Sequence, residues 1–406
     1  MRRVLYVDKA PQIGGSLVSL YHLVRGLDRA RFEPIVLVAE GNPFAERFSD
    51  LGAQVLTRPW ANTPPQTSPM LQGLTRTSAA RKLRDWEWGR RLYHGFGFLV
   101  KHLPRLLERA EAFANLLYDV RPDWVHVNDG IPFNRGEILG ALWARVPVVC
   151  HVRSFEPPTR FDRLLAPRIT AHIFISQAIA DWILGTGVRL RKWYVVHNGV
   201  DLAEFQSRPN TRARIRTELG LPESAFVVAL LGRLVPWKGH EVFLDAMERL
   251  APLHPNLVGC IVGEGWRGHD FEQRLRARVE GGPLKGRVVF AGFRPDVPAL
   301  LQAADALAHT SVEPEPFGRV IVEAMAARLP IVATAAGAVP EILEDERTGL
   351  LVPPGDADRL AQALERLMRD PDLRRRLSAA ARQEVEARFT VQQYVAGVQT
   401  VYEELR

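Results

Sequence analysis

The stretch that decides the fold is Glu313-Pro314-Glu315-Pro316-Phe317-Gly318-Arg319-Val320-Ile321-Val322-Glu323-Ala324-Met325. An apolar, strand-like run that begins at Ala306 precedes it, and a Pro-Phe-Gly turn leads into an apolar run with helical spacing. In open α/β sheets, ligands bind at the carboxyl ends of the strands, where a helix N-terminus presents free backbone N–H groups that suit phosphate. We therefore expect a strand, loop and helix that together bind phosphate.

Two carboxylates, Glu315 and Glu323, stand eight residues apart in this stretch. We expect Glu315 in the loop, facing the ligand, and Glu323 about one and a half turns into the helix. Both can accept hydrogen bonds from hydroxyl groups of a ligand bound over the helix N-terminus. Phosphate recognition beside two hydroxyl-binding carboxylates predicts a nucleotide sugar as the ligand.

The length and composition indicate a globular protein with two domains of ordinary size. The chain has 406 residues, of which 47% are hydrophobic and 24% are charged. No apolar run is long enough to predict a transmembrane helix, and Met1–Val7 predicts a first β-strand rather than a signal peptide. Cys150 and Cys260 lie in apolar runs and are predicted to be buried, reduced thiols. These features predict a cytoplasmic protein.

Short apolar runs alternate with helical patterns along the chain. In the first half, the predicted strands are Arg2–Asp8, Ile35–Glu40, Gln54–Arg58, Trp124–Asn128, Val146–Val152, His172–Ser176 and Trp193–His197. In the second half, they are Phe226–Gly232, Val258–Val262, Val288–Ala291, Ala306–Thr310, Ile331–Thr334 and Gly349–Val352. Alternation of this kind predicts an α/β protein with two doubly wound parallel sheets.

The domain boundary is expected near residues 199–210, where Gly199 and Pro209 interrupt the pattern. We therefore predict an N-terminal domain over residues 1–204 and a C-terminal domain over residues 205–388. The remaining residues, 389–406, form an amphipathic helix that is a candidate to pack across the domains.

Two cations follow the first predicted strand of the second half, in Gly232-Arg233-Leu234-Val235-Pro236-Trp237-Lys238-Gly239. Arg233 leaves the end of the strand, and Lys238 stands where the next helix begins. Two cations at one strand end repel each other unless an anion lies between them, and a diphosphate is such an anion. The alternative is two solvated cations. No Walker pattern is present, which argues against ATP or GTP hydrolysis.

The first predicted strand of the chain ends in a glycine-rich turn. Gly14 and Gly15 allow the backbone to approach a phosphate or sugar closely, and Ser16 is expected to cap the following helix. The alternative is an ordinary glycine-rich turn. His151 stands near the end of another strand, where a side chain with a near-neutral pKa suits proton handling and hydrogen bonding, although a lone histidine is more often structural.

Other motifs favour structural roles. Gly263–Gly268 matches a dinucleotide fingerprint, but the acidic residue expected about twenty positions later is missing, so we predict a tight turn. Glu341 is expected to cap or orient a loop, and Asp356 to cap a late helix. No cluster has the spacing of a metal site, so we expect Arg233, Lys238 and helix termini to meet the diphosphate charge without a metal.

A basic and aromatic segment covers residues 76–115. Between Arg76 and Arg109, nine Lys or Arg residues stand against three Asp or Glu residues. Its aromatic residues include Trp86, Trp88, Tyr93, Phe96 and Phe98. This composition suggests an anionic membrane surface or a lipid-linked acceptor, and the alternative is a solvated helix pair with an aromatic inner face. No nucleic-acid-binding motif is present, so nucleic acid is not an expected partner.

The motifs together resemble a retaining GT-B glycosyltransferase of family four, the glycosyl transferases group 1. The resemblance is strongest from Val195 to about Glu346, and the first half matches loosely through Gly14-Gly15-Ser16 and His151. The motifs that carry it are Asn198–Asp201, Gly232-Arg233 with Lys238-Gly239, Val262–Gly265, Phe290–Phe293, Glu315–Gly318 with Glu323–Ala326, and Gly337 with Pro340-Glu341. Ala338 and Thr310 stand where the family often has Gly and Pro.

The resemblance implies two Rossmann-like domains that face a cleft, with the donor bound mainly by the C-terminal domain and the acceptor by the N-terminal domain. It implies that Arg233 and Lys238 hold the diphosphate and that Glu323 holds the ribose hydroxyls. It further implies that Glu315 contacts the donor sugar and that His151 lies near it. The other implied donor contacts are Gly15, Ser16, Gly232, Phe293, Arg294, Phe317, Gly318, Arg319 and Val320.

The main hypothesis is a retaining hexosyltransferase that moves a sugar from a UDP- or GDP-linked donor to a glycan or lipid-linked acceptor. It needs no cofactor and no obligatory metal, works in cell-envelope or polysaccharide assembly, and makes peripheral contact with anionic membrane at its inner face. One alternative is a GT-B nucleotide-sugar epimerase, which needs no acceptor site. Another is a non-catalytic module that binds nucleotide sugars.

Overall fold

The computed structural model describes residues 1–10, 14–59, 87–265 and 270–405, with side chains from residue 103 onward in the long helix α5. The chain divides into two compact units, which we describe separately. The first unit is Met1–Phe174 with Trp182–Tyr194 and Val401–Arg406, and the second is Ile175–Asp181 with Val195–Thr400. Within the described ranges, no helix is both long and apolar enough to cross a bilayer.

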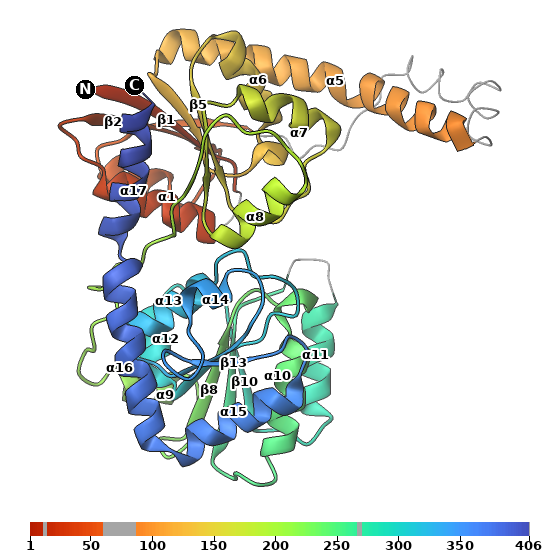
Figure 1. Cartoon of the computed structure of the whole chain (residues 1–406). Helices are drawn as coiled ribbons and strands as arrows, with labels where there is room; N and C mark the ends of the chain where they lie inside the picture. Colours follow the sequence, from red (N-terminus) through yellow and green to blue (C-terminus); the bar gives the residue numbers. More distant parts are fainter. Residues whose placement is uncertain (11–13, 60–86, 266–269, 406) are drawn as a thin grey trace. The chain divides into compact units, whose positions relative to one another are not determined.

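The first unit is built on a seven-stranded sheet with the order β3-β2-β1-β4-β5-β6-β7 (Figure 1). Pairing from β3 across to β6 is parallel. Its central strands consist almost wholly of buried apolar residues, as expected for a parallel sheet covered on both faces. The strands are β1 (Arg2–Asp8), β2 (Phe32–Ala39), β3 (Gln54–Arg58), β4 (Trp124–Val127), β5 (Val148–Val152), β6 (Ala171–Phe174) and β7 (Trp193–Val195).

The helices of the first unit include a closely packed pair, α5 (Glu87–Val120) and α6 (Arg135–Trp143). Gly140 makes this contact possible, because a Cβ atom there would lie 2.3 Å from the carbonyl oxygen of Ala110. The remaining helices are α1 (Gly15–Gly26), α2 (Ala45–Asp50), η1 (Ile131–Phe133), α7 (Arg160–Leu165), η2 (Ala166–Arg168) and α8 (Gln177–Gly185), which runs across the division between the units.

The second unit is built on a six-stranded parallel sheet with the order β10-β9-β8-β11-β12-β13. Its strands are β8 (Phe226–Leu231), β9 (Leu257–Val262), β10 (Val288–Gly292), β11 (Ala306–His309), β12 (Ile331–Thr334) and β13 (Leu350–Val352). Because the chain leaves β8 toward β9 and later returns to β11 on the other side of β8, the direction of winding reverses between β8 and β11.

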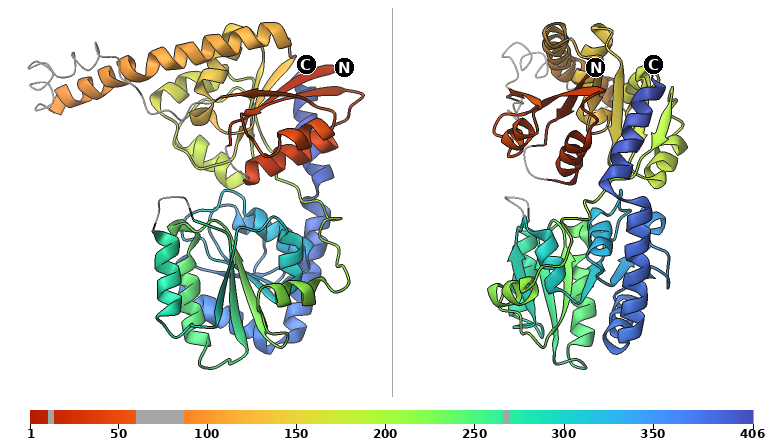
Figure 2. Two further views of the ribbon diagram at one scale, coloured as in Figure 1. Left: turned by 180° about the vertical axis from the view of Figure 1, so that it is seen from behind. Right: turned by 90° about the vertical axis from the view of Figure 1, so that its left-hand side faces the viewer.

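Helices cover both faces of this second sheet, as the views in Figures 1 and 2 show. On one face, α10, α11 and α15 pack over a core that includes Phe243, Met247 and Leu364. On the other face, α9 packs on α12 and α13 packs on α16. The helices are α9 (Thr211–Glu218), η3 (Pro236–Lys238), α10 (His240–Leu250), α11 (Phe271–Glu280), α12 (Val297–Ala303), α13 (Arg319–Ala326), α14 (Val339–Ile342), α15 (Ala357–Arg369), α16 (Pro371–Arg388) and α17 (Val391–Glu404).

The predicted α/β class with two doubly wound parallel sheets is confirmed, and every predicted strand has a counterpart in the structure. The largest difference is in β2, which begins at Phe32 rather than at Ile35. Pro34 lacks the N–H that a residue inside a sheet normally donates to a neighbouring strand. The strand tolerates it because β3 pairs with β2 only from Ile35 onward, so Pro34 has a strand neighbour on one side alone.

Two local predictions are also confirmed. Cys150 and Cys260 are free thiols buried in β5 and β9, and burial raises the pKa of Cys260 to about 12. Asp356 caps α15, because its side chain accepts a hydrogen bond from the backbone N–H of Arg359. The helix expected over residues 389–406 is α17, whose residues through Thr400 fall in the second unit and whose residues from Val401 fall in the first. That it packs across the two domains stays a prediction.

Candidate active site

The residues predicted to hold a diphosphate and a sugar come together at the carboxyl edge of the second sheet. Lys238 follows β8, and Glu315 follows β11, the strand beside it. The winding reverses between these two strands, so α10 and α13 leave toward opposite faces of the sheet. This is the topological switch point, where open α/β sheets bind their ligands.

The carboxylate of Glu315 is buried and receives three hydrogen bonds on one oxygen. Lys238 Nζ lies 2.6 Å from Oε2, and Ser311 Oγ donates to the same atom over 3.0 Å. His309 Nε2 lies 3.1 Å from it. Burial alone raises the pKa of Glu315, but the hydrogen bond from His309 and the charge of Lys238 outweigh it and hold that pKa well below its usual range. Glu315 is therefore ionised at any physiological pH.

Lys238 reaches Glu315 because the turn after β8 packs directly on the end of β11. Thr310 Oγ1 donates to the carbonyl oxygens of Lys238 and Gly239, over 2.9 and 3.1 Å. Gly239 has a φ of +69°, and a Cβ atom at this position would lie 1.9 Å from the carbonyl oxygen of Thr310. The ring of Trp237 supports the ammonium group, with its centroid 4.1 Å from Nζ.

The loop that carries Glu315 is held on its other side by the turn after β12. Glu315 pairs with Gly337 in an isolated parallel bridge, and its carbonyl oxygen accepts from the N–H of Ala338 over 2.9 Å. Gly337 has a φ of +62°, and a Cβ atom there would lie 2.3 Å from that carbonyl oxygen. The position of the Glu315 backbone therefore requires glycine at this turn.

The second carboxylate, Glu323, is the fifth residue of α13, about one and a half turns into the helix, as predicted. This helix begins after Gly318, whose φ is +88°. Glu323 Oε1 accepts a hydrogen bond from Arg319 Nε over 2.7 Å. Burial raises the pKa of Glu323 and the charge of Arg319 opposes that shift. The structure thus places Arg319 against Glu323, and the contact of either with a ribose stays a prediction.

The other predicted donor contacts of the second unit differ in how far their side chains are exposed. Arg233 and Phe293 are exposed at the carboxyl ends of β8 and β10. Phe317 is buried, with its ring 6.2 Å from that of Phe389, so only its backbone is placed to meet a ligand. Gly232 and Val320 lie at the same strand edge, and Gly232 is half-buried.

Arg294 forms ion pairs with two acidic side chains of the second unit. Its guanidinium binds both carboxylate oxygens of Asp296, over 2.8 and 2.7 Å, and also pairs with Glu218. These hydrogen bonds raise its pKa above the usual range. The resemblance implied that Arg294 contacts the donor, and no sequence pattern indicated either carboxylate.

Three predicted donor contacts belong to the first unit. Gly15 and Ser16 are the first two residues of α1, and the cap position is Gly14, which makes no side-chain cap. The expectation that Ser16 caps this helix is therefore wrong, because the helix starts one residue before it. The carbonyl oxygen of Ser16 instead accepts a hydrogen bond from Asn128 Nδ2 over 3.0 Å.

His151 is fully buried on β5 in a hydrogen-bonded chain. Arg153 donates to Nδ1 of His151 over 3.3 Å, and His126 Nε2 lies 3.2 Å from the same atom. Because arginine only donates, Nδ1 of His151 is an acceptor and its ring proton is on Nε2. Burial and the charge of Arg153 hold the pKa of His151 well below 6.5, so the ring is neutral. His126 also contacts Tyr402 Oη, at 2.6 Å from its Nδ1.

Glu341 has the structural role that was predicted for it. Its two carboxylate oxygens accept the backbone N–H groups of Gln177 and Ala178, over 2.8 and 2.6 Å, at the start of α8. Glu341 therefore caps a helix, as an acidic side chain at a helix N-terminus should.

The sequence analysis missed two residues of this site, His309 and Ser311. His309 is the last residue of β11, and Ser311 is the second residue after it. In an extended chain, side chains two residues apart lie on the same face. That spacing, next to a strand end already chosen as a ligand site, is the signal that points to them. Within the described ranges, no group of His, Cys, Asp and Glu is arranged to hold a metal.

Two family models together cover most of the chain. The model described as Glycosyltransferase Family 4 matches residues 13–204, and the model described as Glycosyl transferases group 1 matches residues 211–384. The chain belongs to the GT-B glycosyltransferases. The GT-B fold and the membership in glycosyl transferases group 1 and family 4 are therefore confirmed, and the retaining mechanism stays a prediction.

Curated relatives match mainly through part of their length. Spore coat protein SA of Bacillus subtilis (strain 168) is 30% identical over 256 residues, which cover 60% of this chain and 66% of that protein. A D-inositol 3-phosphate glycosyltransferase of Saccharomonospora viridis is 35% identical over 217 residues, or 52% of this chain and 49% of that protein. The chain thus spans about half to two thirds of the length of the curated relatives it matches.

Solved structures match over the whole chain. Anabaena HepE in complex with UDP and glucose is 25% identical, with a TM-score of 0.80 over 99% of this chain and 100% of that one. The same protein in complex with UDP-glucose has a TM-score of 0.78 at 25% identity, with full coverage of both chains. A glycosyltransferase from Rickettsia africae ESF-5 has a TM-score of 0.81 at 18% identity, which shows the fold alone.

Replacement of Gly239 tests whether the turn after β8 depends on close approach to Thr310. We expect Gly239→Ala to lower the free energy of unfolding by about 2 kcal/mol or more, because strain at positive φ adds to a backbone clash. The matched control is Gly286→Ala, which has a φ of +72° and no heavy atom within 4 Å of the added Cβ. Urea unfolding measures both, and equal losses in the two variants would contradict this account.

Proposed function

We propose that this protein is a retaining hexosyltransferase that uses a UDP- or GDP-linked sugar and transfers the sugar to a hydroxyl of a glycan or lipid-linked acceptor. The observation that carries the proposal is the meeting of Lys238 and the ionised Glu315 at the switch point between β8 and β11. The family membership supports it, as does the likeness to HepE, which has been solved with UDP and glucose and with UDP-glucose.

The proposed division of labour follows from the charges at this edge. The nucleotide diphosphate leaves as an anion, so Lys238 and Arg233 stabilise charge that grows in the transition state. Glu315 accepts hydrogen bonds from hydroxyls of the donor sugar, and Glu323 from those of the ribose. A lysine ammonium has three N–H groups, so Lys238 can bind a phosphate oxygen while it keeps its contact with Glu315. We assign no cofactor and no obligatory metal to the reaction.

Retention is proposed to occur by attack on the face from which the diphosphate leaves. The bond from the anomeric carbon to the phosphate oxygen breaks, the bond to the acceptor oxygen forms, and the acceptor proton passes to a phosphate oxygen. Glu315 is bound by Lys238, His309 and Ser311, which disfavours its use as a covalent nucleophile. The roles of Gly15, Ser16 and His151 toward the donor stay predictions from the resemblance, since these residues belong to the other unit.

The stereochemical proposal is tested by the anomeric configuration of the product. With the donor's α or β configuration known, proton NMR of the purified product is expected to show the same configuration at the transferred sugar. A product of opposite configuration would contradict retention while leaving glycosyl transfer itself intact. Conversion of the donor into a new nucleotide sugar, without any acceptor, would instead favour the epimerase alternative.

The donor assignment is tested by thermal melts against UDP, GDP, ADP and their sugars, with and without EDTA. We expect one nucleotide to raise the melting temperature, and Lys238→Met to weaken its binding about tenfold or more, since a charge-assisted bond to phosphate is lost. Lys285→Met is the control, because Lys285 is exposed and pairs only with Glu280 at 2.7 Å.

Three results of this melt would count against the proposal. Unchanged nucleotide binding by the Lys238→Met variant would remove Lys238 from the site. A stabilisation that EDTA abolishes would show that the diphosphate needs a metal. Absence of any nucleotide effect in the wild-type protein would favour neither the transferase nor the nucleotide-sugar-binding module.

An anionic acceptor is supported by a cavity of about 240 Å³ in the first unit. Lys9, directly after β1, and Arg105, Arg109 and Arg135 line it together with one carboxylate, Glu137. Lys9 pairs with Glu137 at 2.6 Å, and Arg135 pairs with an acidic side chain of α7. Across the described residues, the side chains of Arg105 and Arg109 have no ion pair, so two cations remain for an anionic acceptor group.

This cavity adjoins the basic segment for which membrane contact was predicted. Most of that segment lies outside the residues whose side chains the structure describes, so the membrane contact stays a prediction. Arg105 and Arg109 are its described part, and both are exposed. A phosphate next to a lipid chain would satisfy both cations and place the acceptor at a membrane surface.

Sedimentation with vesicles tests this acceptor proposal. We expect binding to phosphatidylcholine vesicles that contain phosphatidylglycerol and not to phosphatidylcholine alone. Replacing Arg105 and Arg109 together with Ala should weaken binding, by about fivefold for each residue, because each cation near an anionic surface contributes about 1 kcal/mol. Arg191→Ala, another exposed arginine of the first unit, is the control. Equal binding to both vesicle types would contradict the proposal.

A further inference from the structure

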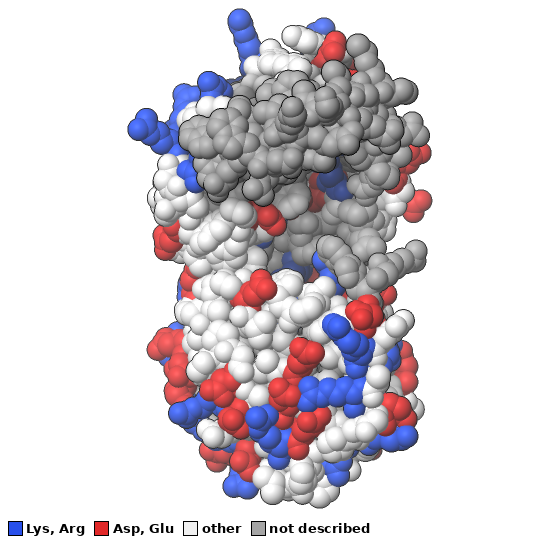
Figure 3. Space-filling view, turned by 90° about the vertical axis from the view of Figure 1, so that its right-hand side faces the viewer, with Lys and Arg blue, Asp and Glu red and all other residues white. Residues whose placement is uncertain are grey.

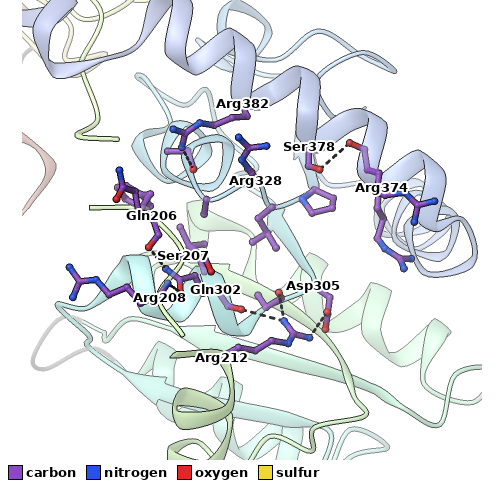
Figure 4. A pocket seen from close by; sticks show the side chains of 18 of the residues that line it. Gln206, Ser207, Arg208, Arg212, Gln302, Asp305, Arg328, Arg374, Ser378 and Arg382 are labelled. Carbon is purple, nitrogen blue, oxygen red and sulfur yellow. Dashed lines mark hydrogen bonds and ion pairs between the residues drawn. The ribbon is translucent and has the colours of Figure 1, made fainter. Parts of the chain in front are cut away.

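The second unit has a larger cavity at the opposite edge of its sheet. Its volume is about 790 Å³. Its walls come from residues between 205 and 212, from the turns that precede β11 and β12, and from α16 between Pro371 and Arg382 (Figure 4). These turns lie at the amino ends of β11 and β12, whereas Glu315 follows the carboxyl end of β11. The cavity is therefore separate from the candidate active site.

Arginine dominates the lining of this cavity. Six arginines and a single acidic residue, Asp305, contribute to its walls. The arginines are Arg208, Arg212, Arg328, Arg374, Arg375 and Arg382. In Figure 4, Arg328 and Arg382 lie near each other on one side of the cavity, and Arg212 and Asp305 lie across from them.

Part of this positive charge is compensated within the protein. Arg212 donates to Asp305 over 2.6 Å, but the other oxygen of Asp305 already binds Arg216 at 2.7 Å. Arg375 and Arg382 pair with the carboxylates of Asp372 and Glu386. Three of the six lining arginines are therefore paired with a carboxylate. One of these three carboxylates, that of Asp305, also binds Arg216.

The other three arginines retain their charge. Arg374 donates to the backbone carbonyl groups of Leu367 and Met368, which carry no net charge. Arg208 and Arg328 are exposed, and among the described residues their side chains make no hydrogen bond or ion pair. The cavity therefore holds about three more positive charges than its neighbours neutralise.

Arg328 also has an unusual backbone. Its φ is +58°, in the left-handed region that a side chain other than Gly, Asn or Asp rarely adopts. Arg121 and Arg145 adopt the same region, with φ of +50° and +57°, so this conformation does not by itself mark a site. It does decide which substitutions position 328 tolerates, because glycine and asparagine adopt it most readily.

The surface elsewhere on the second unit is arranged differently. Figure 3 shows the face that carries α11, where basic and acidic side chains alternate. Arg276 pairs there with Glu272 at 2.9 Å, and Arg278 pairs with Asp245 and Glu248 at 2.5 and 2.9 Å. On this face the arginines named are paired with carboxylates, whereas half of the arginines that line the cavity are not.

We propose that this cavity binds a ligand with two or more phosphate groups. Guanidinium groups bind phosphate oxygens through paired N–H donors, and Ser207 and Ser378 add hydroxyl groups to the same walls. The volume exceeds that of one phosphate, and the surplus charge matches a ligand of several negative charges. Such a ligand leaves the carboxyl edge of the sheet free, so it occupies a second site of this protein. The phosphates belong either to a soluble molecule or to a lipid headgroup.

The test measures pyrophosphate binding by calorimetry in a Lys238→Met background, which removes one of the two candidate donor cations and so weakens binding at the donor site. The test variant adds Arg208→Ala and Arg328→Asn, because asparagine tolerates the left-handed backbone of Arg328. We expect pyrophosphate to bind the background protein and to bind the test variant about tenfold or more weakly. The control adds Arg359→Ala, an exposed arginine of α15 whose side chain makes no described contact, and it should bind as the background does.

A second arm distinguishes the source of the phosphate. Vesicles that carry phosphatidic acid are compared with pyrophosphate in the same three proteins. Loss of vesicle binding in the test variant alone assigns a lipid phosphate, and loss of pyrophosphate binding alone assigns a soluble ligand. If neither probe binds the background protein, or if the control loses as much affinity as the test variant, the proposal is wrong. Because Lys238 is replaced and Arg233 is unchanged in all three proteins, any binding left at the donor site is the same in each, and a difference among them reports on the cavity.

Discussion

The contact between the turn after β8 and the end of β11 is the constraint on which the candidate site depends. Gly239 lies against the carbonyl oxygen of Thr310, and this contact leaves no space for any side chain at position 239. It brings Lys238 within 2.6 Å of Glu315. The contact is possible only because β8 and β11 are neighbours whose following helices leave toward opposite faces. The strand order thus permits the turn contact, and the turn contact in turn places Lys238 against Glu315.

Most of the fold was predictable because parallel strands covered on both faces are continuous apolar runs. Such runs are visible without knowledge of their partners, and so every predicted strand exists. The residues at which strands and helices begin and end depend on the neighbouring elements, and these are where the prediction and the structure differ. Pro34 belongs to β2 because β3 does not yet pair there, and Ser16 does not cap α1 because the helix starts at Gly15. Both facts come from tertiary context, which a local pattern does not contain.

The candidate site was predictable to the same extent. Lys238, Glu315 and Glu323 stand in turns that strand ends and glycines mark, and the structure brings the first two together. The partners of these residues were not predictable. Arg294 pairs with Glu218, which lies 76 positions earlier in the chain, and no local spacing indicates such a pair. Donor roles of the first-unit residues stay predictions.

The two edges of the second sheet differ in how their cations are compensated, and this difference bears on specificity. At the carboxyl edge, Lys238 faces Glu315 and Arg319 faces Glu323, so a ligand there meets cations and carboxylates together. A bare polyphosphate gains the cations but approaches two negative groups, whereas a nucleotide sugar also offers hydroxyls to both carboxylates. At the amino edge, Arg328 and its neighbours offer positive charge with little opposing it. We therefore expect the first edge to favour a ligand that combines phosphate and hydroxyl groups, and the second to favour a ligand by its negative charge.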